Sequence, residues 1–359
     1  MSTANIPKIL TINGVRHDFS EPEAIRWLAE APEQHLKELA NFLADWCNDA
    51  AYISLQTSGS TGTPKQLRAR KLQMLHSAGL TNQYFGLTGE ATALLCMSPA
   101  YIGGRMMVVR ALLGGFNLVV VEPGDNPLKH INQHIDFAAM VPFQFARALK
   151  NSQDKFHWID KLLLGGAALP DHLEKASHQL NTAIWHSYGM SETLSHIALR
   201  RINGPEPSHA FRALPGIELK LDDRGCLIIE APALHDEPLK TNDIAQLLPD
   251  GTFNILGRID DVIISAGVKI HPVQLEHDLA VFFTEPIAII AAADTEAGEV
   301  AVLVAQGSFS PQQLYNIWKQ MEAAIDRSCM PRRIVTVDRL PLTGSGKVDR
   351  QAIKQMVNA

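Results

Sequence analysis

The sequence predicts an α/β protein: a large N-terminal lobe of αβ layers with a small β subdomain, then a small α+β C-terminal domain. The chain has 359 residues, and 46% of them are hydrophobic. This length exceeds that at which a single hydrophobic core usually stops growing. Between residues 52 and 187, short apolar runs alternate with helical patterns, as is typical of α/β layers. Beyond Arg258 the alternation restarts over a segment of minimum domain size. We therefore expect an N-terminal domain at 1–259 and a C-terminal domain at 260–359.

The N-terminal elements follow from local patterns. Asn13-Gly14 separates two apolar runs, 9–12 and 15–19, and favours a type I′ hairpin. Ser20 and Glu23 have the spacing of a capping box, which predicts a helix that begins there. The strands expected in the α/β region are AYISLQT, ATALLCMS, FNLVVVE, FAAMVP, KLLLGGA and TAIWHSY, with helices such as GRMMVVRALL and DHLEKASHQL between them.

Shorter, turn-rich segments follow and predict the small β subdomain. These segments are IELKLDDRGCLIIEAP and GTFNILG, with hairpin turns at 223–225 and 250–251. In the C-terminal domain we expect the strands VIISAG, PIAIIAAAD and EVAVLVAQ and the helices VQLEHDLAVF and PQQLYNIWKQMEAAI.

Composition argues against several classes of protein. The formal net charge of -6 offers no basic excess for nucleic acid. The four cysteines are far apart, without the spacing of a zinc site, and we expect free thiols. No apolar stretch approaches the roughly 20 residues of a membrane span, and the N-terminus does not have the pattern of a signal peptide. We expect a cytoplasmic protein that binds neither nucleic acid nor a membrane.

A loop rich in Gly, Ser and Thr, LQTSGSTGTPK at residues 55–65, follows an apolar run. Backbone N–H groups, hydroxyls and Lys65 in such a loop can surround an anion, so phosphate is the expected ligand. The order of residues in this loop differs from the G-x-x-x-x-G-K-[ST] motif of P-loop NTPases. The pair Gly346-Lys347 does not complete that motif either, because Val348 follows it where the motif requires Ser or Thr. Taken alone, a loop of this composition is more often a solvated connection.

The stretch HSYGMSET, residues 186–193, ends an apolar strand with groups that suit a nucleotide. Tyr188 could stack on a base, Ser191 could reach a phosphate, and Glu192 could hold Mg²⁺. The same letters also fit a strand followed by a helix with Ser191 as its N-cap. Farther on, four charged residues surround the predicted domain junction, an arrangement that also fits a solvated linker: Asp243, Arg258, Asp260 and Asp261.

Taken in order, these stretches resemble the adenylate-forming superfamily of acyl-CoA synthetases, peptide-synthetase adenylation domains and luciferases, from about residue 52 to 350. TSGSTGTPK resembles the phosphate loop, GGAA at 165–168 the adenine-pocket turn, and YGMSET the YGxTE motif. TND and GRIDD resemble the ribose and hinge motifs, and LTGSGKVDR resembles the C-terminal T-x-S-G-K-x-x-R loop. Six motifs in the family's order form a specific signal.

The resemblance implies ATP, Mg²⁺ and CoA as cofactor and co-substrates, bound by an AMP-binding N-terminal domain. It places around the β/γ-phosphates Thr57, Ser58, Gly59, Ser60, Thr61 and Lys65. It places along the adenine Gly165, Gly166 and Ala167, with Tyr188 stacked on the ring. It assigns Ser191 to the α-phosphate, Glu192 to Mg²⁺, and Asp243 and Arg258 to the ribose. In a mobile C-terminal domain it assigns Lys347 to the substrate carboxylate and α-phosphate, Asp260 to the hinge and Gly267 to the CoA channel.

These roles suit a two-step reaction. A carboxylate that attacks the α-phosphate brings two anions together, so Mg²⁺ and a lysine are needed in a water-poor cleft. In the family, the C-terminal domain then rotates and opens a path for the thiol of CoA. The chain departs from the family's pattern because the phosphate loop arrives after a shortened N-terminal subdomain, which leaves a homodimer open.

The acid is indicated by the segment that resembles the family's acyl-pocket motif, where Tyr101 replaces the usual residue. Arg105 and Arg110 lie on the predicted helix 103–113, where an arginine is more often a surface residue than a buried group that binds an anion. A resemblance to the 2-succinylbenzoate-CoA ligases of menaquinone synthesis puts an arginine at position 110, where it would read a second carboxylate beside an aromatic ring. We expect an AMP-forming acid-thiol ligase for this small aromatic carboxylate. The alternatives are another aryl- or acyl-CoA synthetase, an acyl-adenylate ligase that loads a carrier protein, and a non-catalytic nucleotide sensor.

Overall fold

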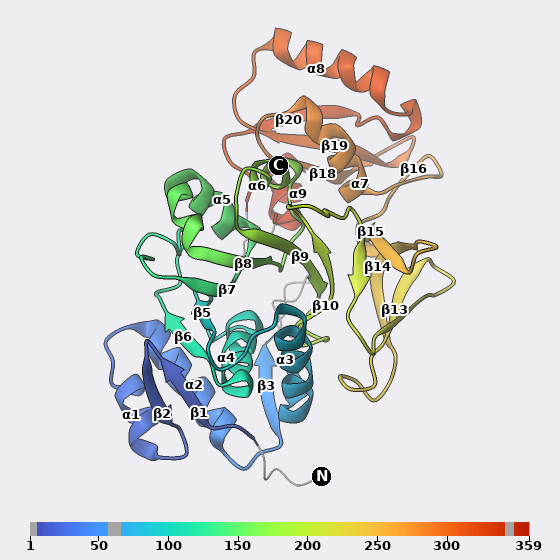
Figure 1. Cartoon of the computed structure of the whole chain (residues 1–359). Helices are drawn as coiled ribbons and strands as arrows, with labels where there is room; N and C mark the ends of the chain where they lie inside the picture. The colour runs from blue at the N-terminus through green and yellow to red at the C-terminus, as the bar shows by residue number, and fades with distance from the viewer. Residues whose placement is uncertain (1–5, 57–65, 342–347, 359) are drawn as a thin grey trace. The chain divides into compact units, whose positions relative to one another are not determined.

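The computed structural model describes residues 6–56, 66–341 and 348–358, and the chain forms two compact units (Figure 1). The large unit comprises residues 1–169, 173–218 and 230–238, and the small unit comprises 170–172, 219–229 and 239–359. Both units combine helices with sheets, so the predicted α/β class is confirmed. The boundary expected at residue 260 and the mobility of the C-terminal domain stay predictions.

The large unit is built on one mixed sheet with the strand order β11-β10-β9-β8-β7-β5-β6-β1-β2. Its central strands β6, β5, β7, β8 and β9 are parallel, and β10 runs antiparallel to β9. The strands are β1 (Ile9–Ile12), β2 (Val15–Asp18), β5 (Thr92–Leu95), β6 (Asn117–Val120), β7 (Ile135–Met140), β8 (Ile159–Leu164), β9 (Ala183–Gly189), β10 (His196–Arg201) and β11 (Phe211–Ala213). A separate antiparallel pair is formed by β3 (Tyr52–Gln56) and β4 (Gln66–Arg70).

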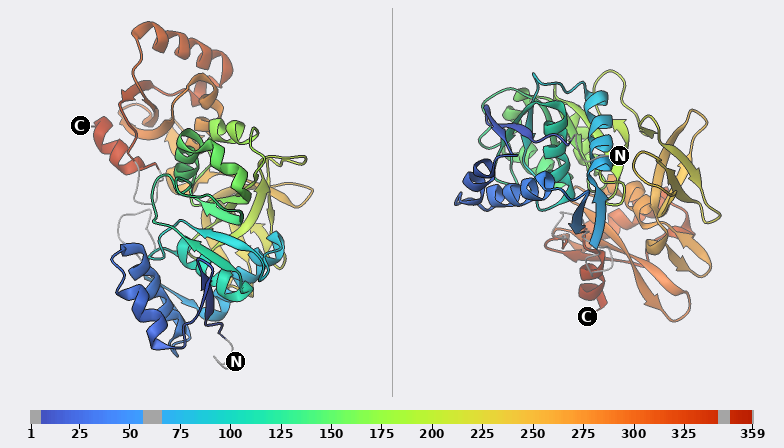
Figure 2. Two further views of the ribbon diagram at one scale, coloured as in Figure 1. Left: turned by 60° about the vertical axis from the view of Figure 1, so that its left-hand side comes forward. Right: turned by 90° about the horizontal axis from the view of Figure 1, so that it is seen from below.

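Helices cover both faces of this sheet. They are α1 (Pro22–Ala29), α2 (Gln34–Cys47), α3 (Lys71–Phe85), α4 (Ile102–Gly114), α5 (Pro142–Asn151) and α6 (Asp171–Ser177). Successive strand residues alternate between two cores: Leu95 joins the core under α3 and α4, whereas Leu94 joins the core under α5. Figure 2 shows α1 and α2 side by side near the β1–β2 edge. The central strands are therefore buried on both faces, which explains their nearly continuous apolar runs.

The N-terminal hairpin is confirmed, but the helix after it begins later than predicted. Asn13 and Gly14 have φ values of 50° and 82°, as a type I′ turn requires. The predicted Ser20–Glu23 capping box is wrong, because α1 begins at Pro22 and its N-cap residue makes no side-chain cap. Proline's fixed φ suits the first helical position, and Ser20 instead donates its backbone N–H and hydroxyl to Asp18.

The small unit contains an antiparallel ribbon and a five-stranded sheet. The ribbon consists of β12 (Glu218–Leu221), β13 (Cys226–Glu230), β14 (Leu239–Leu247) and β15 (Thr252–Arg258). The sheet has the order β17-β16-β19-β18, with β20 parallel to β19. Its strands are β16 (Ile263–Ser265), β17 (Val268–Ile270), β18 (Ile287–Asp294), β19 (Gly298–Gln306) and β20 (Arg333–Val337).

Three helices pack on the five-stranded sheet: α7 (Pro272–Leu279), α8 (Pro311–Ala324) and α9 (Arg350–Asn358). Leu275 of α7 and Met321 of α8 share one core, whereas Ile353 of α9 belongs to a second core. Ile289 and Ile290, which are consecutive in β18, belong to the first and the second core respectively. The helices therefore lie on opposite faces of the sheet.

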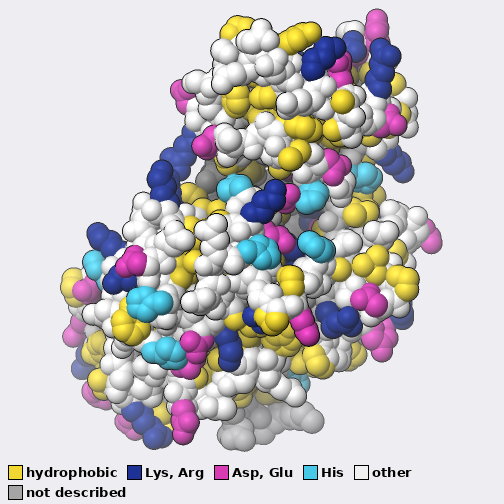
Figure 3. Space-filling view, turned by 45° about the horizontal axis from the view of Figure 1, so that its top comes forward, with side chains coloured by type: hydrophobic (Ala, Val, Ile, Leu, Met, Phe, Trp, Pro, Cys, Tyr) yellow, Lys and Arg dark blue, Asp and Glu magenta, His cyan; other side chains and the backbone are white. Residues whose placement is uncertain are grey.

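The surface and the thiols agree with the composition. On the face drawn in Figure 3, acidic and basic side chains of the described residues are interspersed rather than gathered into a field of one sign. All four cysteines are unpaired, as predicted. No helix in the described ranges is long and apolar enough to cross a membrane.

Candidate active site

Two of the predicted motifs lie together at one edge of the large sheet. The strands β8 and β9 are parallel neighbours, with Leu164 opposite His186. The turn that begins at Gly165 follows β8, and the stretch from Tyr188 to Thr193 covers the end of β9. The carboxyl ends of parallel strands meet at the same edge, which is where α/β sheets bind ligands. The structure thus places the predicted adenine turn beside the predicted YGxTE motif.

The turn after β8 depends on glycine. Gly165 donates its N–H to the carbonyl of Met140 at 3.1 Å, and a Cβ on it would collide with the Ser187 hydroxyl. Gly166 has a φ of 85°, a value that favours glycine. The result is a stretch of exposed backbone next to Tyr188, whose ring lies 6.1 Å from that of Phe211. A flat adenine ring fits such an arrangement.

His186 holds this turn in place, a role that no local sequence pattern indicated. Its Nε2 lies 3.0 Å from the Ala167 carbonyl, which can only accept, so Nε2 carries the proton. Burial, with the charge of Arg200 as a second cause, lowers the pKa of His186 to about 4 and keeps the ring neutral. Arg200 in turn forms a bidentate pair with Glu174 at 3.0 and 2.6 Å.

The stretch after β9 is a tight turn organised by Thr193. This buried residue accepts the N–H of Met190 at 2.9 Å and lies within hydrogen-bond distance of the carbonyls of Met190 and Ser195. Leu194 has a φ of 66°, and β10 begins at His196, so the alternative that Ser191 caps a helix is wrong. Ser191 and Glu192 are half-buried on this turn. Glu192 therefore offers a carboxylate oxygen of the kind that Mg²⁺ prefers.

The two arginines of α4 have different surroundings. Arg105 donates to the backbone carbonyls of Pro99 and Ser54 at 2.9 and 2.8 Å. Arg110 is only 2% exposed, donates from Nη2 to the Ser195 hydroxyl at 2.6 Å, and has a buried Nε with no partner among the described residues. Burial lowers its pKa to about 10, so the guanidinium stays charged at neutral pH. Tyr101, at the start of α4, is 62% exposed.

Arg110 thus lies against the segment that follows the YGxTE motif, although the two are 85 residues apart in sequence. No ion pair joins it to a carboxylate in the part of the chain that the structure describes. An unpaired cation in a protein interior is costly, and a charged ligand is one way to offset that cost.

In the small unit, the predicted ribose and hinge residues form one network. Asp243 and Arg258 face each other across β14 and β15, with Nη1 and Oδ1 3.0 Å apart. The Nη2 of Arg258 lies 3.0 Å from Asp260, which also accepts from the Asn242 amide. Gly267, with a φ of 84°, lies in the hairpin between β16 and β17. Three of the four charged residues near the predicted junction, Asp243, Arg258 and Asp260, are therefore joined in one network rather than scattered on a linker.

The remaining predicted site residues lie outside the described residues: Thr57, Ser58, Gly59, Ser60, Thr61, Lys65 and Lys347. The segments that flank them are described. β3 and β4 pair with Gln56 opposite Gln66, and the backbone N–H of Asp349 donates to the Pro341 carbonyl at 2.9 Å.

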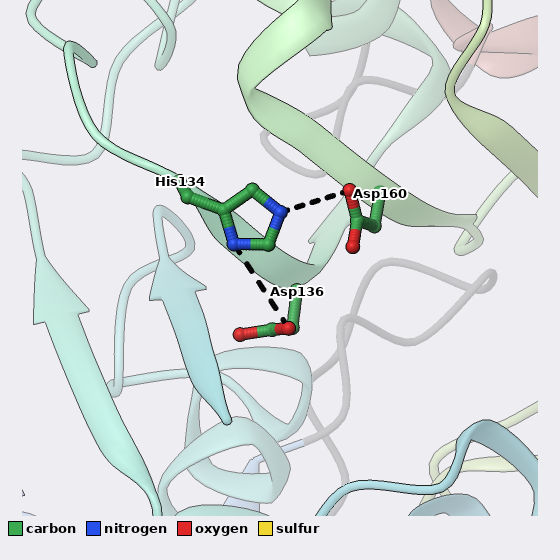
Figure 4. A group of neighbouring side chains, drawn as sticks. All are labelled: His134, Asp136 and Asp160. Atoms are coloured by element: carbon green, nitrogen blue, oxygen red, sulfur yellow. Dashed lines mark hydrogen bonds and ion pairs between the residues drawn. The ribbon is translucent and has the colours of Figure 1, made fainter. Parts of the chain in front are cut away.

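A second polar group lies away from these motifs (Figure 4). His134 lies between Asp160 and Asp136, with its Nε2 2.9 Å from Asp160 and its Nδ1 4.0 Å from Asp136. Asp136 and Asp160 lie near the amino ends of β7 and β8, at the opposite edge from the motif-bearing turns. Asp136 also accepts the backbone N–H of Thr92 at 2.7 Å. We interpret this partly exposed group as polar contacts at this edge of the sheet.

Known proteins resemble this chain over most of its length. The family model described as AMP-binding enzyme matches residues 10–229. The 2-succinylbenzoate-CoA ligase of Lactococcus lactis is 27% identical over 334 residues, which cover 87% of this chain and 72% of the relative. The probable 2-succinylbenzoate-CoA ligase of Mycobacterium tuberculosis is 26% identical, over 91% of this chain and 90% of the relative.

Solved structures agree. An acyl-CoA synthetase (AMP-forming)/AMP-acid ligase II-like protein from Dyadobacter fermentans has a TM-score of 0.61 and 31% identity, and the match covers 93% of this chain and 98% of that one. An o-succinylbenzoate CoA synthetase from Bacillus subtilis, in complex with its acyl-adenylate, shares the fold with a TM-score of 0.70, 23% identity and coverage of 84% and 68%. The predicted superfamily is thereby confirmed, and this chain belongs to the family of AMP-binding enzymes.

Proposed function

We propose that this protein is an AMP-forming acid-thiol ligase for 2-succinylbenzoate. It would convert the acid and ATP into acyl-AMP and pyrophosphate, and then transfer the acyl group to CoA to give 2-succinylbenzoyl-CoA for menaquinone biosynthesis. The observation that carries the proposal is Arg110, a buried cation beside the turn of the YGxTE motif without a described carboxylate partner. The names of the relatives support the same acid.

The chemistry of the acid explains why such an arginine is needed. 2-Succinylbenzoate has two carboxylates, so one stays charged while the other is activated. A guanidinium with a free Nε–H can bind a planar carboxylate with paired hydrogen bonds, which a lysine cannot do. An aliphatic acid with one carboxylate would leave Arg110 unpaired. Arg110 would therefore select a dicarboxylate.

The other residues would serve ATP and CoA. Glu192 would hold Mg²⁺, which supplies positive charge to the phosphates when bound. We propose that the exposed backbone after β8 and Tyr188 bind the adenine, that Ser191 binds the α-phosphate, and that the Asp243–Arg258 pair binds the ribose. The residues that would bind the β/γ-phosphates are Thr57, Ser58, Gly59, Ser60, Thr61 and Lys65. Asp260 would act at the hinge and Gly267 at the CoA channel, and Tyr101 would contact the acid.

A pyrophosphate-release assay tests the function. With Mg-ATP and a panel of acids, we expect release with 2-succinylbenzoate and, when CoA is added, a CoA thioester detected by mass spectrometry. Release with a different acid would support the adenylation reaction but contradict 2-succinylbenzoate as the substrate. That outcome is expected of another acyl-CoA synthetase. Release without a CoA thioester, followed by acylation of a carrier protein, would favour the carrier-loading alternative. The cytoplasmic location, the homodimer and the absence of nucleic-acid and membrane partners stay predictions.

Replacing Arg110 with glutamine should reduce kcat/KM for 2-succinylbenzoate by about 10- to 100-fold, since hydrogen bonds to charged groups contribute about 1.5–3 kcal/mol. The monocarboxylate analogue 4-oxo-4-phenylbutanoate lacks the aromatic carboxylate, so its kcat/KM should change little. Steady-state kinetics with both acids measure the difference. Arg105→Gln, on the same helix, is the matched control and should not change the ratio of the two values. An equal loss for both acids in Arg110→Gln would remove Arg110 from substrate recognition.

A further inference from the structure

A chain of buried hydrogen bonds leads away from Arg110 into the core of the large unit. Nη2 of Arg110 lies 2.6 Å from Oγ of Ser195, which lies 3.3 Å from Nδ1 of His196. Nε2 of His196 lies 3.3 Å from Oγ1 of Thr81, and this hydroxyl lies 3.3 Å from the carbonyl of Ser77. The chain connects α4, the start of β10 and α3, and His196 and Thr81 are 6% and 1% exposed.

With a neutral ring at His196, the chain has one direction in which every link has a donor and an acceptor. The Ser77 carbonyl can only accept, so the Thr81 hydroxyl donates to it. Thr81 can then accept from Nε2–H of His196, which leaves a lone pair on Nδ1 for the Ser195 hydroxyl. Ser195 keeps its oxygen lone pairs for Arg110. This arrangement requires a neutral imidazole with its proton on Nε2.

The surroundings favour that neutral state. Burial, and then the charge of Arg110, hold the pKa of His196 well below its ordinary value. The backbone is also fixed at this point: Gly189 lies opposite His196 in the β9–β10 pair, and a Cβ at Gly189 would lie 2.6 Å from the Cα of His196. The backbone of His196 therefore packs closely against the end of β9.

We propose that His196 is a positioning residue for recognition of the second carboxylate. By accepting the Ser195 hydroxyl, neutral His196 turns the serine oxygen toward Nη2 of Arg110, and this bond fixes the plane of the guanidinium. The Nε–H of Arg110, which has no partner among the described residues, then stays available for the acid. The inference rests on the proposed function and adds the orientation of Arg110 to it.

Two amide replacements of His196 separate its two hydrogen bonds. His196→Asn places an oxygen near the position of Nδ1 and keeps an acceptor for Ser195. His196→Gln places an N–H near the position of Nε2 and keeps only the donor to Thr81. We expect His196→Gln to raise KM for 2-succinylbenzoate about tenfold, the equivalent of about 1.4 kcal/mol, with kcat and the KM for 4-oxo-4-phenylbutanoate nearly unchanged. His196→Asn should remain close to the unsubstituted enzyme. Equal losses in both variants, or equal losses for both acids, would indicate packing alone and overturn the proposal.

A spectroscopic measurement on the unsubstituted protein decides the point even if neither variant folds. In ¹⁵N-histidine NMR of the full chain, His196 should titrate neither to the imidazolium nor to the Nδ1–H tautomer between about pH 6 and 8, the range in which histidines usually change charge. An Nδ1–H tautomer or an imidazolium would overturn the proposal.

The Arg110→Gln kinetics distinguish failure of the Arg110 hypothesis from failure of the His196 hypothesis. An unchanged preference for the dicarboxylate in Arg110→Gln contradicts the role of Arg110 in substrate recognition, which carries the proposed function. A lost preference in that variant with an unchanged KM in His196→Gln contradicts only the role of His196.

Discussion

Replacing Lys347 with alanine is expected to slow formation of the acyl-adenylate by about 10²- to 10³-fold, the usual cost of removing one donor that stabilises a transition state. A carboxylate and an α-phosphate repel each other as they approach, and a compact ammonium can contact oxygens of both. The thioester step from supplied acyl-adenylate should be unaffected, since pyrophosphate has already left. Single-turnover assays of pyrophosphate release and of CoA-thioester formation measure the two steps separately.

Lys354→Ala is the matched control for this experiment. Lys354 is an exposed lysine of α9, seven positions after Lys347, and its replacement should leave both steps unchanged. Equal slowing of both steps in Lys347→Ala would contradict the assigned role. If neither step changed in Lys347→Ala, the lysine would have no catalytic part, and the alternative of a nucleotide sensor would gain support.

The fold could largely be predicted because its signals are local. Apolar runs marked the buried central strands, and the helix expected at 103–113 appears as α4, Ile102–Gly114. The end of α6 could not be predicted. The pattern DHLEKASHQL extends to Leu180, but the helix ends at Ser177, and the amide of Asn203 donates to the carbonyls of Ser177 and Leu180 at 3.0 and 3.3 Å. A cap supplied from a distant strand connection leaves no local pattern.

The candidate site could likewise be predicted only in part from the sequence. Motif residues such as Gly165 and Glu192 were recognised from short stretches, and Arg110 from its spacing to Tyr101 in a resembling subfamily. Their partners were missed. Ser195 meets Arg110 across 85 residues, and His186 contacts the Ala167 carbonyl across 19. Histidines in a strand fit both core positions and ligands, so only the fold reveals which groups they contact.

Glu276 and Arg350 form a similar long-range contact, and Arg350 is three positions after Lys347 in the sequence. The guanidinium of Arg350 pairs with both oxygens of Glu276 at 2.5 and 2.8 Å and donates to the Ile289 carbonyl at 2.7 Å. Glu276 also accepts the Ile289 N–H at 2.6 Å. Burial opposes the charge of Arg350, but the hydrogen bond and charge of Glu276 more than offset this and raise its pKa. The pair joins α7, β18 and the first residue of α9.

Replacing Glu276 with alanine should therefore destabilise the small unit by about 3–5 kcal/mol, since removing one partner of a largely buried pair leaves the other charge uncompensated. Urea unfolding of the full chain, followed by probes in the small unit, measures the loss. Asp278→Ala, an exposed carboxylate on the same helix, should change stability by less than about 0.5 kcal/mol. Adding Arg350→Ala to Glu276→Ala should recover part of the loss, because no unpaired charge then remains. If Glu276→Ala lowered the free energy of unfolding as little as Asp278→Ala, the pair would not hold α9 to the sheet. The apolar contacts of Ile353 would then have to hold α9 instead.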